Sequence, residues 1–135
     1  MVYGIGVDLV RIARMAAALE RHGERFARRI LHRTELDAFD RTPRKAALLA
    51  KHFAAKEALL KALGTGLRYG ITWHDISVAR DPLGKPFVTC TGRVRELLDG
   101  AGVRACHLSL TDESDYAAAF VTLTTDDGDP LAVSS

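Results

Sequence analysis

Hydrophobic residues alternate with glycine at the start of the chain. The segment from Val2 to Val7 has a period of two that predicts a short strand, and Asp8 follows at its end. Gly4 and Gly6 lie inside this strand, where glycine is unfavourable because it has no side chain to pack. Their presence therefore indicates that another part of the protein comes very close to the strand backbone.

From Val10 onward, apolar residues recur at intervals of three and four, which is the period of a helix. This pattern predicts a first helix that ends at His22-Gly23 and a second helix over residues 24–31. A short third helix is expected to begin with Thr34 as its N-cap and with Asp37 in the acidic capping position.

The strongest helical signal covers Lys45 to Leu63. This segment is rich in Ala, Leu and Lys, which are good helix formers, and Gly64 follows where a helix would end. The remaining elements are expected to be strands over 72–79, 85–90, 107–110 and 116–123, with a short helix from a Thr91 cap to Leu98. The order of elements predicts an α+β fold, with helices packed on a mostly antiparallel sheet.

The length and composition are those of a single globular domain. The 135 residues are 47% hydrophobic and 27% charged, and no apolar run approaches the roughly 20 residues that a membrane helix needs. We expect one domain over residues 1–124 and a flexible tail over 125–135. The N-terminus lacks a secretory signal pattern, so a cytoplasmic location is expected, with Cys90 and Cys106 as inert thiols.

Arginines concentrate in the first two predicted helices. The net charge of +2 is too small to indicate nucleic-acid binding, and the aromatic residues do not interleave with the basic ones. Arg11, Arg14 and Arg21 form a stripe on one face of the first helix, and Arg25, Arg28 and Arg29 continue the positive charge. From the residues alone, this stripe is interpreted as a solvated face.

Glu57 and Lys61 are four residues apart, so they share one face of the long helix. By spacing alone they form an ordinary pair on a helix surface. Together with Asp8, however, they would provide two carboxylates for Mg²⁺ and a lysine for phosphate charge. The spacing by itself does not decide between these interpretations.

Two segments resemble the signature segments of the 4'-phosphopantetheinyl transferases. They are Gly4-Ile5-Gly6-Val7-Asp8 and residues 53–66, which begin Phe-Ala-Ala-Lys-Glu-Ala. Supporting segments follow in the order typical of the family, at 73–76, 84–86 and 107–111. The chain from residue 1 to 124 is therefore similar to this family, and especially to its short bacterial type, the holo-[acyl-carrier-protein] synthases.

The resemblance implies transfer of 4'-phosphopantetheine from coenzyme A to a serine of an apo acyl carrier protein. The products would be holo carrier protein and adenosine 3',5'-bisphosphate, in support of fatty acid biosynthesis. It implies that Asp8 and Glu57 hold Mg²⁺ and that Lys61 contacts phosphate oxygens, which makes these three residues the catalytic set. The serine needs a base, and both Glu57 and a metal-bound water are candidates.

The resemblance also implies a coenzyme A pocket, a carrier-binding surface and a homotrimer with active sites at the subunit junctions. Carrier binding is expected at Arg14, Met15 and Arg21, although Met15 also fits an ordinary core role. The expected coenzyme A residues are His52, Lys61, Gly64, Gly66, Lys85, Pro86 and His107. A buried helix histidine is the alternative for His52, and Lys56 is interpreted as either functional or solvated. Asp112 stands where many relatives have histidine, which leaves its role open.

Two other classes of function agree less well with the sequence. A nucleic-acid-binding module would explain the arginines, but no motif of such modules is present. A non-catalytic coenzyme A-binding protein would be expected to have lost part of the catalytic set, whereas Asp8, Glu57 and Lys61 are all present. The sequence therefore favours the enzyme.

Overall fold

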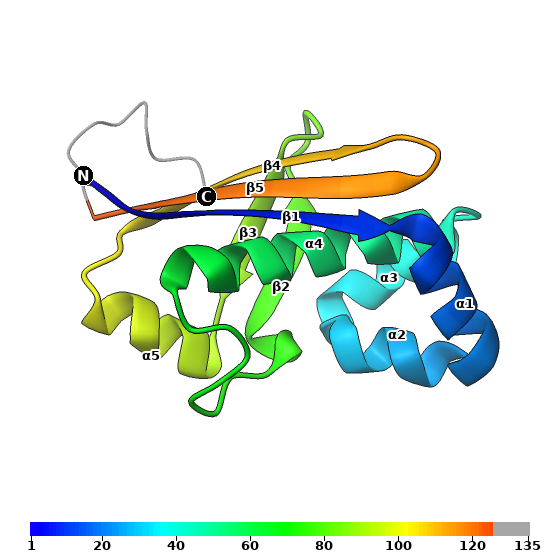
Figure 1. Cartoon of the computed structure of the whole chain (residues 1–135), viewed down its shortest axis with the longest axis horizontal. Helices are drawn as coiled ribbons and strands as arrows, with labels where there is room; N and C mark the ends of the chain where they lie inside the picture. Colours follow the sequence, from blue (N-terminus) through cyan, green and yellow to red (C-terminus); the bar gives the residue numbers. More distant parts are fainter. Residues whose placement is uncertain (126–135) are drawn as a thin grey trace.

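The structure is a computed structural model that describes residues 1–125 (Figure 1). Its elements are β1 (Val2–Arg11), α1 (Ile12–His22), α2 (Glu24–Ile30), α3 (Arg33–Arg41), α4 (Lys45–Leu63), the 3-10 helix η1 (Trp73–Asp75), β2 (Ile76–Arg80), β3 (Pro86–Cys90), α5 (Gly92–Gly100), β4 (Ala105–Asp112) and β5 (Tyr116–Thr124). Apart from Thr125, the expected tail lies outside the described residues. Within residues 1–125, no helix has the length and apolarity to cross a lipid bilayer.

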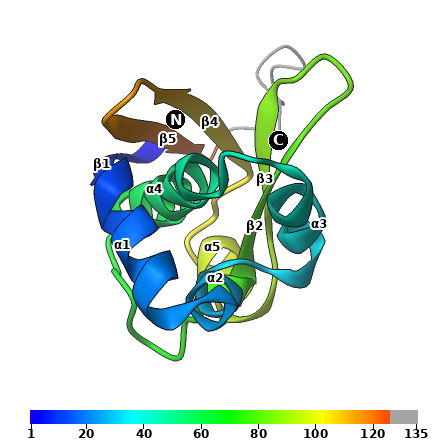
Figure 2. The same ribbon diagram turned by 90° about the vertical axis from the view of Figure 1, so that its right-hand side faces the viewer.

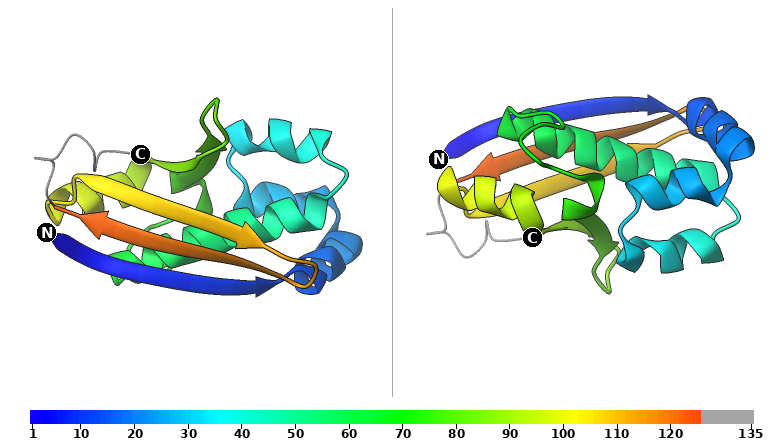
Figure 3. Two further views of the ribbon diagram at one scale, coloured as in Figure 1. Left: turned by 90° about the horizontal axis from the view of Figure 1, so that it is seen from above. Right: turned by 90° about the horizontal axis from the view of Figure 1, so that it is seen from below.

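The main sheet has three antiparallel strands in the order β1-β5-β4, and β2 and β3 form a separate antiparallel hairpin. Helix α4 runs along one face of the main sheet, which we call the inner face (Figures 1 and 3). Helices α1, α2 and α3 gather around one end of α4 (Figures 1 and 2), and α5 lies near the other end (Figure 1). The architecture is therefore α+β, as the sequence predicts.

Helix α4 lies in direct backbone contact with β1. A Cβ atom added to Gly6 would lie 1.9 Å from the carbonyl oxygen of Ala58, and one on Gly4 would lie 2.0 Å from that of Ala62. No side chain larger than hydrogen fits at either position. The close approach expected from the two glycines is confirmed, and the neighbour is the helix that carries Glu57 and Lys61.

Strand β1 is longer than the sequence predicts. It continues to Arg11, which pairs with Tyr116 of β5, so the first helix begins at Ile12 rather than near Val10. The prediction was wrong here because pairing with β5 continues along the strand beyond its alternating pattern. Asp8 consequently lies inside the strand and not at its end.

The start of α3 also differs from the prediction. His32 is the N-cap, and its Nδ1 accepts the backbone N–H of Thr34 at 3.1 Å. Glu35 completes the capping box by accepting the backbone N–H of His32 at 2.7 Å. The expected cap at Thr34 was wrong because an imidazole replaces the usual Ser or Thr of this motif.

The other boundaries lie close to those predicted. The bounds of α4 are as predicted, and Gly64 ends it in the left-handed conformation at φ 87°. The segment expected to be one strand from Thr72 begins instead with η1, because Thr72 and Asp75 form a local capping box before β2. Cys90 and Cys106 are thiols, and burial raises the pKa of each to about 12, as expected of inert cysteines.

Candidate active site

The three predicted catalytic residues lie where α4 crosses β1. The Lys61 ammonium donates to Asp8 Oδ1 at 2.9 Å and to the Val7 carbonyl at 3.0 Å. Lys61 is half-exposed, whereas the Asp8 side chain is mostly covered. Residues 53 positions apart thus form an ion pair because Gly4 and Gly6 allow α4 to lie against β1.

Glu57 is half-buried, one helical turn before Lys61. Burial and the negative charge of Asp8 raise its pKa, while Lys61 and Arg14 act in the opposite direction. The two carboxylates therefore lie close enough to repel each other. A cation between them would remove this repulsion, and hard cations prefer carboxylate oxygens.

The part of the chain that the structure describes contains no group of three or more His, Cys, Asp or Glu side chains able to hold a metal. Asp8 and Glu57 would therefore supply two ligands at most. Mg²⁺ commonly uses one or two carboxylates and takes its remaining ligands from water and substrate phosphates. The donor set fits Mg²⁺ bound together with a phosphorylated substrate.

Arg14 of α1 reaches the same region of α4. Its guanidinium lies 5.8 Å from the centre of the Phe53 ring, and Phe53 in turn packs against Trp73 with ring centres 5.2 Å apart. Arg14 belongs to the basic face of α1 and, because Phe53 precedes Glu57 by one turn, it also lies near Glu57. The sequence predicted its place on the basic face but not its closeness to Glu57.

Arg14 and Arg21 are exposed on α1, where an acidic partner can reach them. Met15 is different, because only 1% of it is exposed and it belongs to the hydrophobic core. Its expected contact with a partner is corrected by the structure, since the side chain offers no surface. Of the two interpretations of Met15, the core role is the one that the fold gives it.

His107 lies on the opposite face of the sheet from Asp8. Asp8 pairs with Ala119, whose other neighbour is Leu110, whereas His107 pairs with Thr122 next to Ile5. Side chains alternate between faces along a strand, so the second set points away from α4, on what we call the outer face. A single chain therefore does not bring His107 to the Asp8–Glu57 pair.

The other predicted coenzyme A residues lie on two loops. Gly64 and Gly66, with φ of 87° and 61°, form the turn after α4, one turn beyond Lys61. Lys85 and Pro86 lie at the β2–β3 hairpin. The structure therefore brings the two glycines close to Lys61 and places Lys85 and Pro86 on a separate element.

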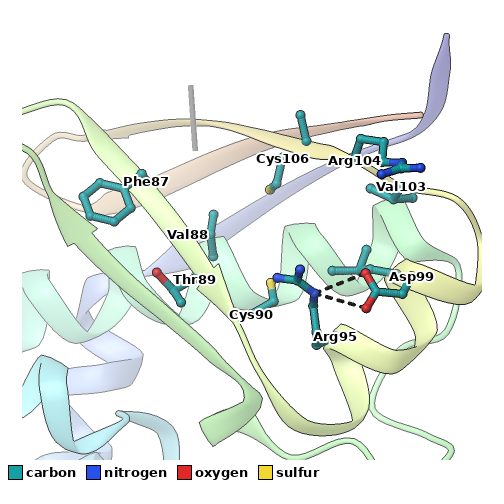
Figure 4. A pocket seen from close by; sticks show the side chains of 11 residues that line it. Phe87, Val88, Thr89, Cys90, Arg95, Asp99, Val103, Arg104 and Cys106 are labelled. Carbon is teal, nitrogen blue, oxygen red and sulfur yellow. Dashed lines mark hydrogen bonds and ion pairs between the residues drawn. The ribbon is translucent and has the colours of Figure 1, made fainter. Parts of the chain in front are cut away.

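A cavity of about 480 Å³ lies between β3, α5 and β4 (Figure 4). Phe87 and Cys106 line it, and they are the chain neighbours of Pro86 and His107. Arg95 pairs with Asp99 in its wall, with Nε–Oδ1 at 3.1 Å. The cavity is thus bordered by two segments that the sequence assigned to coenzyme A.

His52 and Lys56 both point to a carboxylate that the sequence did not single out. His52 Nδ1 donates to Glu35 Oε2 at 2.5 Å, and Lys56 Nζ donates to Glu35 Oε1 at 2.6 Å. Lys56 is completely buried, so the solvated alternative was wrong. The missed signal was Glu35 itself, three residues after His32, which completes a capping box without a Ser or Thr cap.

Asp112 has a structural partner on each side. Its carboxylate lies 3.4 Å from Lys51 Nζ and 3.6 Å from an Arg44 guanidinium nitrogen. These ion pairs connect the end of β4 to the N-terminal part of α4. Asp112, which stands where many relatives have histidine, thus connects β4 of the sheet to α4.

Comparisons with known proteins agree on one family. Residues 4–121 match the profile of the 4'-phosphopantetheinyl transferase superfamily. The chain is 50% identical over 125 residues to a holo-[acyl-carrier-protein] synthase from Azoarcus sp., covering 93% of this chain and 99% of the relative. The crystal structure of holo-[acyl-carrier-protein] synthase from Neisseria meningitidis matches with TM-score 0.87 and 39% identity, covering 92% of this chain and 99% of that one. The Helicobacter pylori synthase in complex with coenzyme A matches with TM-score 0.78 and 28% identity, covering 89% and 99%.

Proposed function

The chain belongs to the 4'-phosphopantetheinyl transferase superfamily, and on this premise we propose that it transfers 4'-phosphopantetheine from coenzyme A to a serine of an apo acyl carrier protein. The products are holo carrier protein and adenosine 3',5'-bisphosphate, and the reaction supports fatty acid biosynthesis. The observation that carries the proposal is the chain-long match to holo-[acyl-carrier-protein] synthases, in a chain that retains Asp8, Glu57 and Lys61.

The reaction exchanges the phosphoanhydride bond of the coenzyme A pyrophosphate for a phosphate ester bond to serine. The serine oxygen attacks the phosphorus that carries pantetheine, and the bond from that phosphorus to the bridging oxygen of the pyrophosphate breaks, so that this oxygen leaves with adenosine 3',5'-bisphosphate. The serine proton must leave, and negative charge develops on the phosphate oxygens. Glu57 is one candidate for the base, and water at the site is the other.

Lys61 would stabilise the developing charge. Its ammonium is held beside Asp8 by one ion pair and one carbonyl, and its half-exposed position lets it reach a phosphate in the adjacent space. Asp8 and Glu57 would hold Mg²⁺, which supplies positive charge to the pyrophosphate. Cytoplasmic Mg²⁺ would serve this purpose, and the cytoplasm is the location that the sequence predicts.

The remaining predicted contacts complete the proposal. Gly64 and Gly66 would receive the phosphates beyond Lys61, while Lys85 and Pro86 would bind the nucleotide end near the cavity beside β3. His52 would contribute to the site indirectly, by holding the Glu35 carboxylate, because its Nδ1 already forms a hydrogen bond with Glu35 Oε2. The exposed Arg14 and Arg21 would dock an acidic carrier protein by charge complementarity.

We further propose a homotrimer assembled through the outer face of the sheet. Apolar side chains are exposed on this face, with Ile5 at 61%, Val7 at 59%, Leu9 at 63% and Phe120 at 46%. A contiguous apolar patch of this kind is typical of a protein interface. The partner on this face would be another copy of the chain. His107 lies on the same face, away from Asp8 and Glu57 of its own chain. In the trimer, the partner subunit's His107 would then complete the site.

The test is a direct assay. The protein is incubated with coenzyme A, Mg²⁺ and an apo carrier protein, and the carrier is followed by mass spectrometry for the gain of one phosphopantetheine group. Chelation of the metal and the Glu57→Gln variant should each abolish the gain, the variant mainly through lost metal affinity. A carrier that stays unmodified with the unaltered protein would refute the function. Full activity of Glu57→Gln at ordinary Mg²⁺ would instead refute the site.

A further inference from the structure

The buried ammonium of Lys56 connects α4 to three other elements. Its Nζ donates to Glu35 Oε1 of α3 at 2.6 Å, to the Ile30 carbonyl of α2 at 2.6 Å and to the Trp73 carbonyl of η1 at 3.3 Å. The three acceptors match the three N–H groups of a charged lysine. Every donor of this buried group is therefore used.

Glu35 lies at the centre of the same cluster, and only 2% of it is exposed. Its second oxygen, Oε2, accepts from His52 Nδ1 and from the backbone N–H of Val78 in β2 at 3.1 Å. Burial would raise the pKa of Glu35, but the His52 hydrogen bond and the Lys56 charge outweigh burial and lower it. The carboxylate is therefore ionised and paired in the interior.

This cluster fixes the position of α4 immediately before the catalytic residues. Lys56 precedes Glu57 by one residue, so the two side chains leave the helix about 100° apart. One points into the core, and the other points toward Asp8. Any rotation of α4 that moves Glu57 must also move the Lys56 ammonium away from three fixed acceptors.

A second contact extends the cluster to the surface. The Trp73 carbonyl accepts a hydrogen bond from Lys56, and the Trp73 ring packs on Phe53. The Arg14 guanidinium in turn lies over the Phe53 ring. The buried charges thus stabilise both the helix that contains Glu57 and the packing of Trp73 on Phe53, the ring that Arg14 contacts. Replacing a buried ion pair with apolar residues is often neutral for stability. Stability alone therefore does not explain why a buried ion pair lies where α4 meets α2, α3 and η1.

We propose that Lys56 and Glu35 are positioning residues, which set the rotation of α4 so that the Glu57 carboxylate stands beside Asp8 in the geometry for metal binding. This inference rests on the proposed function, because it assigns a purpose to the metal site. Partners that orient metal ligands typically affect metal affinity by about tenfold to a hundredfold when they are lost. The cluster should therefore control metal affinity beyond its effect on folding.

The test compares three variants by Mn²⁺ binding in the presence of coenzyme A, followed by electron paramagnetic resonance. Glu35→Gln/Lys56→Met removes both buried charges together, so neither is left uncompensated. Glu35→Gln alone keeps the shape and weakens the cluster. Leu59→Ala is the matched control, because Leu59 is fully buried on the same helix and has no part in the cluster. All measurements are made where circular dichroism shows each variant folded.

We expect the double variant to weaken Mn²⁺ binding about tenfold and Glu35→Gln to weaken it less, while Leu59→Ala binds within about twofold of the unaltered protein. If the charge variants bind Mn²⁺ as Leu59→Ala does at equal thermal stability, the cluster is merely structural and the inference is wrong. Should the double variant not fold, Glu35→Gln against Leu59→Ala decides by the same criterion. Absence of Mn²⁺ binding by the unaltered protein would overturn the proposed metal site, and the positioning role with it.

Discussion

At the scale of single residues, Glu57 experiences opposing electrostatic influences. Burial and Asp8 favour its protonated form, whereas Lys61 and Arg14 favour its carboxylate, and the balance raises its pKa. Protons should therefore compete with Mg²⁺ at this residue at a higher pH than at an ordinary glutamate. Metal affinity is expected to fall on acidification as Glu57 becomes protonated.

The contribution of Asp8 can be measured directly. In metal-free protein, Asp8→Asn should lower the pKa of Glu57, because a negative neighbour is removed and Lys61 loses its partner. Carboxyl-carbon NMR titration reports this value. The exposed Asp115→Asn is the control and should leave Glu57 unaffected. An unaltered pKa of Glu57 in Asp8→Asn would show that the two carboxylates do not interact.

Arg14 and Arg21, the two arginines proposed to dock the carrier protein, should behave differently when their charge is reversed. Arg21→Glu is expected to raise the KM for carrier protein severalfold and to leave that for coenzyme A nearly unchanged, with an effect that diminishes in salt. Arg14→Glu should affect metal and coenzyme A binding as well, because Arg14 lies within electrostatic reach of Glu57. Steady-state kinetics with each substrate varied in turn distinguishes them. Identical profiles for both variants would contradict this assignment.

At the scale of elements, the site depends on the contact between β1 and α4. Gly4 and Gly6 allow the helix backbone to touch the strand, and Gly64 ends the helix just beyond Lys61. The ion pairs of Asp112 with Lys51 and Arg44 hold the opposite end of α4 to β4. The proposed catalytic residues are therefore positioned by the closeness of two backbones more than by their own contacts.

Gly6→Ala tests this contact. The added methyl group would lie 1.9 Å from the Ala58 carbonyl oxygen, so α4 must move away from β1. We expect a loss of about 3 kcal/mol in the free energy of unfolding, the upper part of the range for overpacking. Chemical denaturation measures it, and Mn²⁺ affinity should fall with it. Gly100→Ala at the end of α5 is the control, because nothing lies within 4 Å and the change should be neutral or slightly stabilising. Equal stability of the two variants would refute the argument.

At the scale of the whole molecule, the sheet has one face covered by α4 and one exposed apolar face. Exposed Ile5, Val7, Leu9 and Phe120 would be costly for a lone chain, and His107 lies among them rather than near Asp8. Both features have one explanation if copies of the chain associate through this face. Assembly would then be a condition of activity as well as of stability.

Val7→Lys should dissociate the proposed trimer, because it places a charge in the centre of the apolar outer face. Sedimentation velocity is expected to show trimers for the unaltered protein and monomers for the variant, with loss of transferase activity. Leu83→Lys is the matched control, since Leu83 is 95% exposed in the β2–β3 turn and should leave assembly intact. A variant at Val7 that stays trimeric would place the interface elsewhere.

The sequence by itself determined the α+β class, the bounds of α4, the close approach at Gly4 and Gly6, and the family through its signature segments. These features depend on local periodicity, turn chemistry and residue type. The extension of β1 to Arg11, the His32 cap, and the buried cluster of Glu35 and Lys56 were decided by the tertiary structure alone. The reason is physical. The sequence around Lys56 is that of a solvated helix residue, and its three acceptors come from distant segments of the chain that only the fold brings together.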